Sequence, residues 1–382
     1  MWTSPLSRMR ALFGLILGGL LAGCATLPSS GPTASEVKRG AERGSLGMQF
    51  RIVDIDQQTI ERVGAAEAAA RSTTVRLASL AASAVNDVVG PGDVLSIGIY
   101  EVGVTLFAGG APADAAGFDP SAKGQMFPEV VVDRDGAIRL PYVGRLVVSG
   151  HTTADIEQMI DVALKGKSQS PQAIVGVRQN LSGTVYISGD VRRPGRLELS
   201  LQHERLLDAI ALAGGSAATI DDTIVRLSRG QRAVEERLSD IEAGEPDDLV
   251  LVPGDRIELL HKPLTLVIMG ATGRVAQVPF EASTVSLAEA VARAGGPSDV
   301  QADPTAVFLF RYDKSASATE VPIIYRLNMM SPASYFVAQR FAMQDKDVIF
   351  VANAAANRPA KLVNIVNQLF SPLITARAIA GN

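Results

Sequence analysis

Residues 185–189 read VYISG and residues 206–215 read LLDAIALAGG, and both stretches return 81 residues later as LVIMG at 266–270 and LAEAVARAGG at 287–296. Because one offset covers a strand-like and a helix-like stretch together, we interpret them as an internal repeat. Each helical stretch ends in Gly-Gly, where the chain can turn left-handed without a steric penalty. The repeat predicts two tandem α+β units, each a small sheet with one helix, with turns at Gly214, Gly215, Gly295 and Gly296.

Each repeat closes with a turn followed by a strand. The first closes with PGDRIEL at 253–259 and the second with DKDVIF at 345–350. A similar turn precedes both repeats, in GPGDVLSIGIY at 90–100, where an alternating strand follows it. Glycine supplies unusual backbone angles and proline restricts the turn between them. The sequence predicts a structural turn formed by Gly90, Pro91, Gly92 and Asp93.

The residues after this early turn predict the rest of a small domain. The stretch PEVVVDRDGAIRLPYVG at 128–144 predicts two strands joined by Asp-Gly at 135–136, a dipeptide favoured in two-residue hairpins. A helix is expected to begin at Thr152, where Asp155 completes a capping box. Residues 171–178 predict a further strand.

Three other stretches have weaker patterns. Residues 47–56 alternate like a strand, and residues 59–83 are rich in alanine and favour a helix. Residues 107–126 are rich in glycine, alanine and proline, and nothing in them predicts packing. We therefore expect a loop between the first strand of the early domain and the strands that follow.

The N-terminus has the pattern of a secretory signal. Arg8 and Arg10 precede an apolar run at 11–21, which is too short for a permanent membrane span. The run ends in Leu-Ala-Gly before Cys24, the only cysteine, and resembles the lipobox of bacterial lipoproteins. The resemblance implies cleavage before Cys24 and lipidation of its thiol, and Ala25 favours sorting to the outer membrane. The alternative is an ordinary free cysteine beside a signal peptide.

The C-terminal residues 359–380 predict an amphipathic helix about 33 Å long, against a hydrocarbon core of roughly 30 Å. Its polar side fits a watery lumen if several copies form a ring, with the apolar side towards lipid. The alternative is a helix packed on its own domain or lying in the membrane interface. Pro372 and Arg377 fit the pattern less well. The predicted lumen-lining residues are Lys361, Asn364, Gln368, Ser371 and Thr375, and the predicted lipid-facing residues are Leu362, Ile365, Val366, Leu369, Phe370 and Leu373.

The motif order resembles a known family. GPGDVLSI, VVDRDGAIRLPYVGRL at 131–146 and the helix after Gly150 resemble the polysaccharide export domain, and the two repeats resemble SLBB (soluble-ligand-binding β-grasp) domains. Together with the lipobox, they resemble the Wza-like outer-membrane polysaccharide export lipoproteins. The resemblance implies a ring, typically an octamer, with an α-helical barrel in the outer membrane and an inner-membrane polysaccharide copolymerase as partner. The chain departs from the family pattern in the loop at 107–126, at His203-Glu204, and at Asp345-Lys346-Asp347 in place of Pro-Gly-Asp.

The expected fold class is α+β: tandem small β-rich domains, comprising an export domain and two β-grasp-like units, with a C-terminal amphipathic membrane-spanning helix. The expected localisation is the outer membrane, lipid-anchored, with a large periplasmic portion. We expect a signal peptide at 1–23, a lipidated tether and N-terminal segment at 24–86, the export domain at 87–180, SLBB units at 181–262 and 263–354, and the C-terminal helix at 357–382.

Composition and motifs argue against several other functions. The net charge is −4 without a Lys/Arg cluster, which argues against a nucleic-acid partner. The sequence contains no nucleotide-binding glycine loop or nucleophile elbow, and HERLL at 203–207 lacks the second histidine of a zinc helix. His151, His203 and His261 are expected at the surface or its boundary, and the acidic pairs at 221–222 and 247–248 in solvated turns. We therefore expect no catalytic residues, metal or cofactor.

Three functional hypotheses follow. The first is a passive, porin-like conduit that exports exopolysaccharide or capsular polysaccharide through a homo-oligomeric ring. The second is a periplasmic adaptor that binds a polysaccharide or soluble ligand and has no pore of its own. The third is a periplasmic glycan-modifying enzyme, which would have to shorten or alter the polymer. The family resemblance favours the first.

Overall fold

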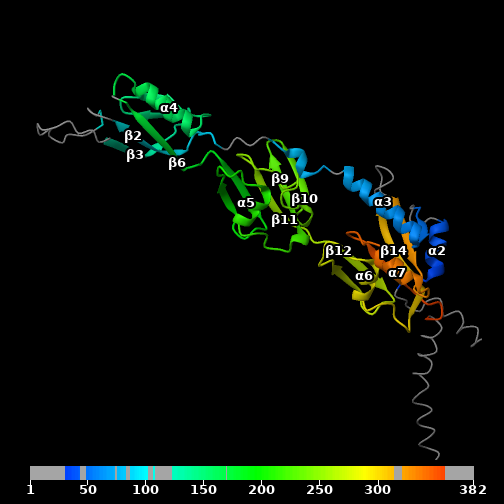
Figure 1. Ribbon diagram of the computed structural model, residues 1–382. Helices are drawn as coiled ribbons and strands as arrows, with labels where there is room; N and C mark the ends of the chain where they lie inside the picture. Colours follow the sequence, from blue (N-terminus) through cyan, green and yellow to red (C-terminus); the bar gives the residue numbers. More distant parts are fainter. Residues whose placement is uncertain are drawn as a thin grey trace, which may run out of the picture. The chain divides into compact units, whose positions relative to one another are not determined.

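The computed structural model describes residues 31–43, 49–73, 75–82, 87–101, 106–107, 123–168, 170–313 and 321–357. The chain divides into two compact units, unit 1 (Met1–Thr74 with Pro263–Asn382) and unit 2 (Val75–Lys262). Unit 1 is therefore built from two segments distant in the sequence, coloured blue and yellow to red in Figure 1. The predicted signal peptide, Cys24 and the predicted C-terminal helix from Pro359 lie outside the described residues.

The first repeat forms a five-stranded sheet in unit 2. The order of the strands is β10-β9-β11-β7-β8, in which β7 and β11 are parallel and the other neighbours are antiparallel. Its elements are β7 (Thr184–Gly189), β8 (Gly195–Glu198), α5 (Leu206–Leu212), the 3₁₀ turn η3 (Ile220–Asp222), β9 (Thr223–Arg229), β10 (Arg232–Arg237), the 3₁₀ turn η4 (Leu238–Asp240) and β11 (Arg256–His261).

The second repeat forms the corresponding sheet in unit 1. The order is β1-β15-β14-β16-β12-β13, which is the order of the first repeat with one strand added at the edge. Its elements are β12 (Thr265–Gly270), β13 (Ala276–Pro279), α6 (Leu287–Arg293), β14 (Ala302–Asp313), β15 (Val321–Leu327), α7 (Ala333–Arg340) and β16 (Val348–Asn353). The shared order confirms the two α+β units that the repeat predicts.

The helices of the two repeats pack through equivalent positions. In the first repeat the buried side chains of α5 are Leu206, Ala209 and Ile210. In the second repeat those of α6 are Leu287, Ala290 and Val291, each 81 residues later. The apolar spacing visible in the sequence therefore identifies the core face of each helix.

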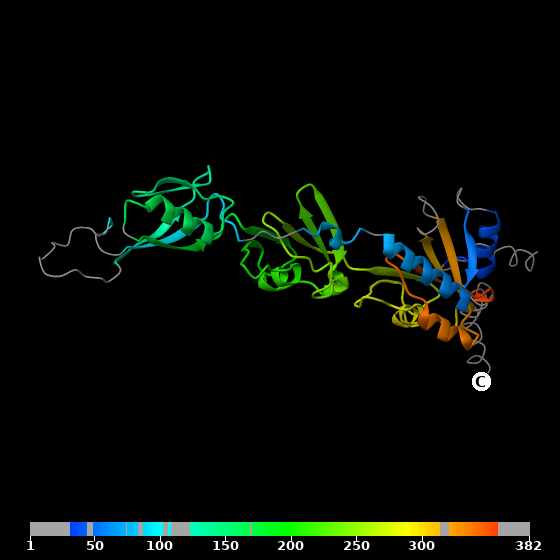
Figure 2. The same cartoon turned by 45° about the horizontal axis from the view of Figure 1, so that its top comes forward.

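The export domain occupies the first part of unit 2. Three strands form one sheet in the order β3-β2-β6, β4 and β5 form a second, and α4 lies over one face of the larger sheet (Figure 2). The predicted capping box is present, since the backbone N–H of Asp155 donates to Oγ1 of Thr152 over 3.2 Å. The elements are β2 (Val94–Glu101), β3 (Lys123–Val131), β4 (Ala137–Leu140), β5 (Gly144–Val147), α4 (Thr153–Leu164) and β6 (Gln172–Gln179).

The predicted hairpin around Asp135-Gly136 is wrong in its pairing. The turn exists, and the N–H of Gly136 donates to the carbonyl of Asp133 over 2.9 Å. However, β3 pairs with β2, while β4 pairs with β5. Ile138 and Leu140 of β4 are buried in the core of the domain, so the chain crosses into the second sheet after the turn. The turn residues set the reversal of the chain, and burial decided its partner.

The predicted loop at 107–126 is also only partly correct. Residues 123–126 already belong to β3, and residues 108–122 lie outside the described residues. Phe107 packs against the core of the domain, with its ring centre 5.7 Å from that of Phe127 and 5.1 Å from that of Tyr142. A single aromatic residue at the start of a glycine- and alanine-rich stretch therefore contributes to the core.

The segment before the export domain contributes to both units. The predicted strand is shorter than expected, and the predicted helix starts earlier and ends at Thr73, before a short 3₁₀ turn. The strand pairs in parallel with the edge strand β15 of unit 1. The elements are α2 (Ala34–Arg43), β1 (Arg51–Asp54), α3 (Gln57–Thr73) and the 3₁₀ turn η2 (Leu77–Leu80).

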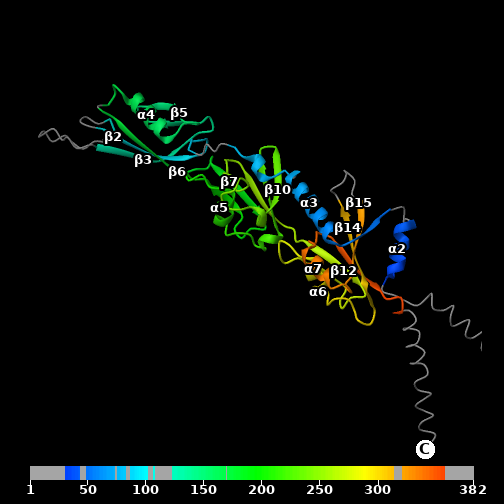
Figure 3. The same ribbon diagram turned by 45° about the vertical axis from the view of Figure 1, so that its right-hand side comes forward.

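α2 packs on one face of the sheet of the second repeat, and the equivalent face of the first repeat differs in its side chains. In the first repeat, Arg226 of β9 is paired with Glu258 of β11, and Nη1 of Arg226 lies 2.9 Å from the carboxylate. The equivalent cross-strand pair in the second repeat is Phe308 and Phe350, and Val37 of α2 packs into this cluster. An apolar face requires cover, whereas an ion-paired face can remain in water. The other face of this sheet carries α3, α6 and α7 (Figure 3).

Replacing Gly189 or Gly270 with alanine is expected to destabilise its own unit by at least about 2 kcal/mol. Both glycines end the first strand of a repeat with φ of 83° and 91°. An added Cβ would lie 2.1 Å from the carbonyl oxygen of Leu259 or 2.2 Å from that of Val351. Chemical denaturation of each variant measures the effect. Gly244→Ala is the control, since that glycine also has positive φ but open space around it, and an equal loss there would attribute the effect to φ alone.

Candidate functional site

Three buried aspartates repeat along the described chain, each just before a strand. Asp93, Asp255 and Asp347 each accept a hydrogen bond from the backbone N–H three residues earlier, at 2.8, 3.0 and 2.7 Å. The residue before each aspartate has positive φ: 93° at Gly92, 88° at Gly254 and 67° at Lys346. The sequence DKD therefore forms the same turn as PGD, because the carboxylate closes it in each case.

The glycine at position 90 has a different role from the one predicted. It does not have positive φ, unlike Gly92. A Cβ on Gly90 would instead lie 2.5 Å from Cβ of Ser182, and Oγ of Ser182 donates to the Asp93 carboxylate over 2.8 Å. Position 90 therefore requires glycine for close approach to the segment that leads into the first repeat.

Each repeat also contains a buried arginine–aspartate pair. Arg229 binds Asp255 through Nε and Nη2 at 2.9 and 2.6 Å, and Arg311 binds Asp347 at the same two distances. The rings of Tyr325 and Phe341 lie 5.7 and 5.1 Å from the guanidinium carbon of Arg311. Two parallel hydrogen bonds hold a carboxylate firmly. Each pair ties a central strand to the turn that begins its neighbour.

Sequence reasoning missed these arginines. The signal was available, since Arg229 and Arg311 occupy equivalent positions near the end of strands with alternating apolar residues. An arginine at the same position in both repeats, near the end of a largely apolar strand, indicates a shared structural role. Burial raises the pKa of Asp347 above the usual value for aspartate, although hydrogen bonds from Arg311 act in the opposite direction.

In unit 2 the N-terminal segment reaches the arginine directly. The carbonyl of Leu80 accepts a hydrogen bond from Nη1 of Arg229 over 2.5 Å, and Leu77 and Leu80 are buried in the core of the repeat. The backbone N–H groups of Leu77 and Ala78 donate to Glu236 and Asp247 over 3.0 and 2.9 Å. The 3₁₀ turn η2 therefore packs into the core of the first repeat.

In unit 1 the same segment approaches the equivalent arginine through α3. Glu67 accepts a hydrogen bond from Nε2 of Gln344 over 2.6 Å, and its carboxylate lies 4.0 Å from Nη1 of Arg311. A cavity of about 510 Å³ lies beside them, between α3 and the ends of β14 and β15. The N-terminal segment thus contacts the buried arginine of each repeat with a different element.

The prediction that Asp247 and Asp248 lie in a solvated turn is wrong. Both are only 3% exposed. Asp247 binds η2 through Ala78 and forms an ion pair with Arg76. Asp248 accepts hydrogen bonds from the N–H groups of Leu207 and Gly244, both over 3.0 Å. These carboxylates are occupied by backbone groups, which the polar sequence around them does not reveal.

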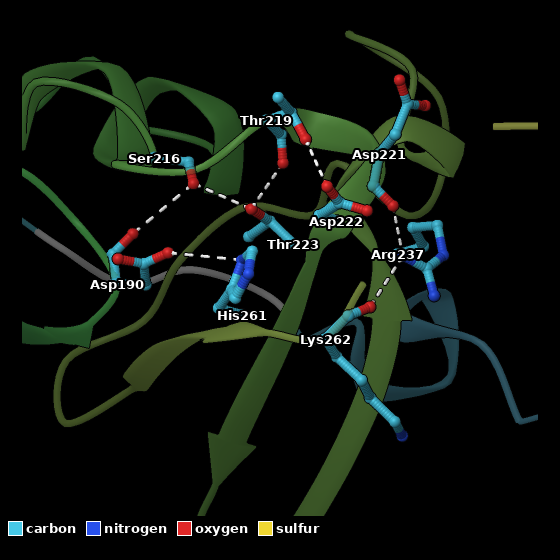
Figure 4. A network of polar contacts seen from close by, with 9 residues as sticks. All are labelled: Asp190, Ser216, Thr219, Asp221, Asp222, Thr223, Arg237, His261 and Lys262. Carbon is cyan, nitrogen blue, oxygen red and sulfur yellow. Dashed lines mark hydrogen bonds and ion pairs between the residues drawn. The ribbon is translucent and has the colours of Figure 1, made fainter. Parts of the chain in front are cut away.

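The second acidic pair lies in a polar network at one end of the sheet of the first repeat, where β9 begins and β10 and β11 end (Figure 4). Asp222 accepts a hydrogen bond from Oγ1 of Thr219 over 3.0 Å, while the backbone carbonyl of Asp221, not its carboxylate, binds Arg237. His261 lies 4.0 Å from Asp190. Like His151 and His203, it is exposed, which confirms the expectation for the three histidines.

Within the described ranges, no group of three or more His, Cys, Asp or Glu side chains is arranged to hold a metal ion. Over the same residues, no helix combines the length and apolar character that a membrane crossing requires.

The two ends of the described part of unit 1 lie together. The backbone of Thr33 forms a bridge with Asn353 at the end of β16. Nδ2 of Asn353 donates to the carbonyl of Gly31 over 3.1 Å, and Oδ1 of Asn353 accepts from Nδ2 of Asn357 over 3.1 Å. Asn353 and Asn357 are both buried. One asparagine therefore joins the residues nearest to Cys24 and to the predicted C-terminal helix.

Comparison with known proteins identifies the family. Residues 81–178 match the polysaccharide biosynthesis/export protein family, and residues 183–258 and 265–351 each match the SLBB domain. The chain is 32% identical to the capsule polysaccharide export protein BexD of Haemophilus influenzae over 96% of both chains. The chain belongs to the outer-membrane polysaccharide export family.

Other relatives agree with this assignment. The capsule polysaccharide export outer membrane protein CtrA of Neisseria meningitidis is 33% identical, over 96% of both chains. The EPS I polysaccharide export outer membrane protein EpsA of Ralstonia solanacearum is 27% identical, over the full length of both. The chain is accordingly an outer-membrane protein with a periplasmic portion, in a family of export proteins and not of enzymes.

The predicted site residues fall into two groups. The turn residues at 90–93, 214–215 and 295–296 are described, and all four glycines of the Gly-Gly pairs have positive φ. Cys24 and the predicted lumen-lining and lipid-facing residues from Lys361 to Thr375 lie outside the described residues. The described site is therefore the frame that holds both ends of unit 1, and the segments proposed to enter the membrane extend from it.

Proposed function

We propose that the chain is a lipid-anchored subunit of a homo-oligomeric translocon that exports capsular polysaccharide or exopolysaccharide across the outer membrane. Cys24 carries the lipid, the export and SLBB domains form periplasmic rings, and the C-terminal helices line the pore. An inner-membrane polysaccharide copolymerase delivers the polymer. Relatives that match this chain over nearly its whole length are named for capsule export and EPS export.

The observation that carries the proposal is that Gly31 and Asn357, at the two ends of the described part of unit 1, both contact Asn353. Cys24 is seven residues before Gly31, and seven residues span at most about 25 Å. Pro359, the start of the amphipathic segment, is two residues after Asn357. Because Gly31 and Asn357 both contact Asn353, the lipid anchor and the helix start from one place and can enter the same leaflet.

The composition of the amphipathic segment supports a pore for hydrated sugars. Its polar stripe contains Asn364, Gln368, Ser371 and Thr375, which offer exchangeable hydrogen bonds and no strong charge. Rings of acidic side chains, which are typical of cation channels, have no counterpart in the stripe. The single cation, Lys361, stands at its beginning.

The second candidate function is a periplasmic adaptor that binds a polysaccharide or soluble ligand and has no pore of its own. The cavity of about 510 Å³ beside Arg311 and Glu67 favours it, because SLBB domains are named for ligand binding. In this case the C-terminal helix would lie in the membrane interface.

A tag placed after Asn382 tests the proposal. We expect an impermeant antibody to label the tag on intact cells, since a spanning helix places the C-terminus outside. The control is a tag between Glu242 and Gly244, in an exposed loop of unit 2, which should be labelled only after permeabilisation. In a separate variant, Cys24→Ser should release the protein from the membrane anchor. Labelling of the C-terminal tag only after permeabilisation, with export intact, would contradict the pore and favour the adaptor.

A further inference from the structure

Unit 1 exposes large apolar side chains at one end of its sheet. Val300 is 86% exposed, Met330 67%, Tyr335 51% and Phe336 73%. Val300 precedes β14, and the other three belong to the connection between β15 and β16. Four such side chains at one end of a unit form a surface that water solvates poorly.

These side chains lie at the end of the sheet where Gly31 and Asn357 contact Asn353. The N–H of Ala354, directly after β16, donates to the carbonyl of Gln301, the neighbour of Val300, over 2.9 Å. The N–H of Met329 donates to the carbonyl of Pro304 near the start of β14 over 2.8 Å. Ala302 at the start of β14 also pairs with Asn353 at the end of β16.

The orientation of α7 places its first turn at this end. The helix begins at Ala333, shortly after Met330, and Tyr335 and Phe336 belong to its first turn. At its other end, the carbonyl of Phe341 accepts from the N–H of Leu287, and Arg311 binds the carbonyl of Ala342 near the opposite end of β14. The aromatic residues are therefore on the side of Asn353, and not on the side of the buried arginine.

The first repeat provides an internal comparison. Its connection between β10 and β11 spans residues 238–255, all described, and buries Leu238, Ile241, Leu249 and Leu251 in the core. No large apolar side chain of that connection is exposed. The corresponding connection of the second repeat forms α7 and exposes aromatic residues. The exposed connection thus belongs to the unit that carries both chain ends.

We propose that this end of unit 1, the surface formed by Val300, Met330, Tyr335 and Phe336, rests in the phospholipid headgroup region of the periplasmic leaflet of the outer membrane. The proposal rests on the lipid anchor of the proposed function, which holds Gly31 within about 25 Å of the bilayer. Aromatic side chains favour the boundary between headgroups and acyl chains. This contact sets the orientation of unit 1 relative to the membrane.

Apolar burial, and not charge, drives this contact. Charged residues of both signs lie close to the surface. Asp299 precedes Val300, and Arg274 lies in the loop after β12, in which Thr272 forms a bridge with Pro297. Electrostatic attraction to anionic lipid therefore nearly cancels, and the contact should persist in high salt. A basic patch would instead lose its membrane contact as salt increases.

A fluorescent probe at position 336 tests the proposal. The full-length lipidated protein carrying Phe336→Cys is labelled with an environment-sensitive dye and reconstituted into vesicles of phosphatidylethanolamine with some phosphatidylglycerol. The dye reacts only at position 336, since lipidation occupies the thiol of Cys24, the one native cysteine. The matched control is Tyr312→Cys, which is 56% exposed near the opposite end of β14.

We expect brominated lipids to quench most of the fluorescence at position 336 and none at position 312, in low and in high salt. Equal accessibility of both positions to a water-soluble quencher would overturn the proposal. Protection of position 336 from both quenchers would also overturn it, and would show that another protein surface covers this end.

Removal of residues 359–382 distinguishes failure of this proposal from failure of the pore. Quenching at position 336 that persists in the truncated protein supports the surface, whatever the tag after Asn382 shows. Protein that does not float with the vesicles at all would contradict the lipid anchor. Protein that floats without quenching at position 336 would contradict the surface alone.

Discussion

Deletion of residues 359–382 is expected to remove essentially all polymer from the cell surface while leaving both described units folded. The amphipathic segment has the length and polar stripe that a ring of pore helices requires. Without it, the periplasmic rings have no passage through the hydrocarbon core. The described fold ends at Asn357, whose side chain is already satisfied by Asn353, so the deletion spares the last contact of unit 1.

The measurement is extracellular polymer, detected with a polymer-specific antibody, together with thermal unfolding of the purified truncated protein. Deletion of Gly381 and Asn382 alone is the matched control and should leave export unchanged, because it retains the whole stripe. Normal export by the longer deletion would reject the pore and leave the adaptor as the better account. Loss of export together with loss of folding would require the lumen side chains to be tested singly, starting with Gln368→Leu.

Arg311→Met is expected to destabilise unit 1 by about 3–5 kcal/mol, because it leaves the buried Asp347 carboxylate without its partner. Two hydrogen bonds of 2.9 and 2.6 Å are lost, and a third, from Nη2 to the carbonyl of Ala342, disappears with them. Methionine keeps a long, unbranched side chain at this position but carries no charge. Chemical denaturation, with hydrogen exchange of β14 and β16 as a local readout, measures the loss.

The pH dependence of this variant has a definite sign. The pKa of Asp347 is already raised by burial, and removal of Arg311 raises it further. A carboxyl whose pKa is higher in the folded state stabilises the fold below its unfolded pKa, and that stabilisation is lost as the pH rises through the folded pKa. The variant should therefore recover part of its stability on acidification from neutral pH. Unchanged stability at all pH values would show that Asp347 was never held as a buried charge.

Two control variants are compared with Arg311→Met, one with a smaller expected effect and one with a similar effect. Arg326 also forms a two-bond ion pair, with Asp54, but at the partly exposed edge of the same sheet. Arg326→Met should cost about 1 kcal/mol or less, because solvent screens an exposed pair. Arg229→Met removes the equivalent buried pair of unit 2 and should resemble Arg311→Met, with its effect confined to β9 and β11.

Much of the described fold depends on short sequence patterns and could be predicted from them. The first strand, the helix and the closing strand of each repeat follow from the sequence pattern, and the capping box at Thr152 is present as its spacing predicts. The hairpin at Asp135-Gly136 shows the limit of such reasoning. A turn dipeptide specifies a reversal within a few residues, but the partner of β4 depends on burial against distant parts of the domain.

The candidate site also contains features that the sequence predicts and features that it does not. The glycines of the two Gly-Gly pairs adopt the positive φ expected after a helix, whereas Gly90 does not. The arginines that hold Asp255 and Asp347 were missed, because the sequence does not reveal which charges are buried as pairs. The acidic pair at 247–248 was assigned to solvent for the same reason, although each carboxylate binds backbone N–H groups. Burial is a property of the assembled core and not of a short window of sequence.

The sequence was sufficient to show two repeats and a resemblance to the polysaccharide export family, and it predicts a signal peptide and an amphipathic C-terminal segment. The tertiary structure alone decided where the N-terminal segment lies. β1 pairs with Val321–Leu327, about 270 residues later in the sequence. α2 covers Phe308 and Phe350 of one repeat, whereas Arg226 and Glu258 occupy the equivalent positions in the other. The physical reason is that a strand edge or apolar face selects its partner by the free energy of burial, which depends on residues far apart in the sequence.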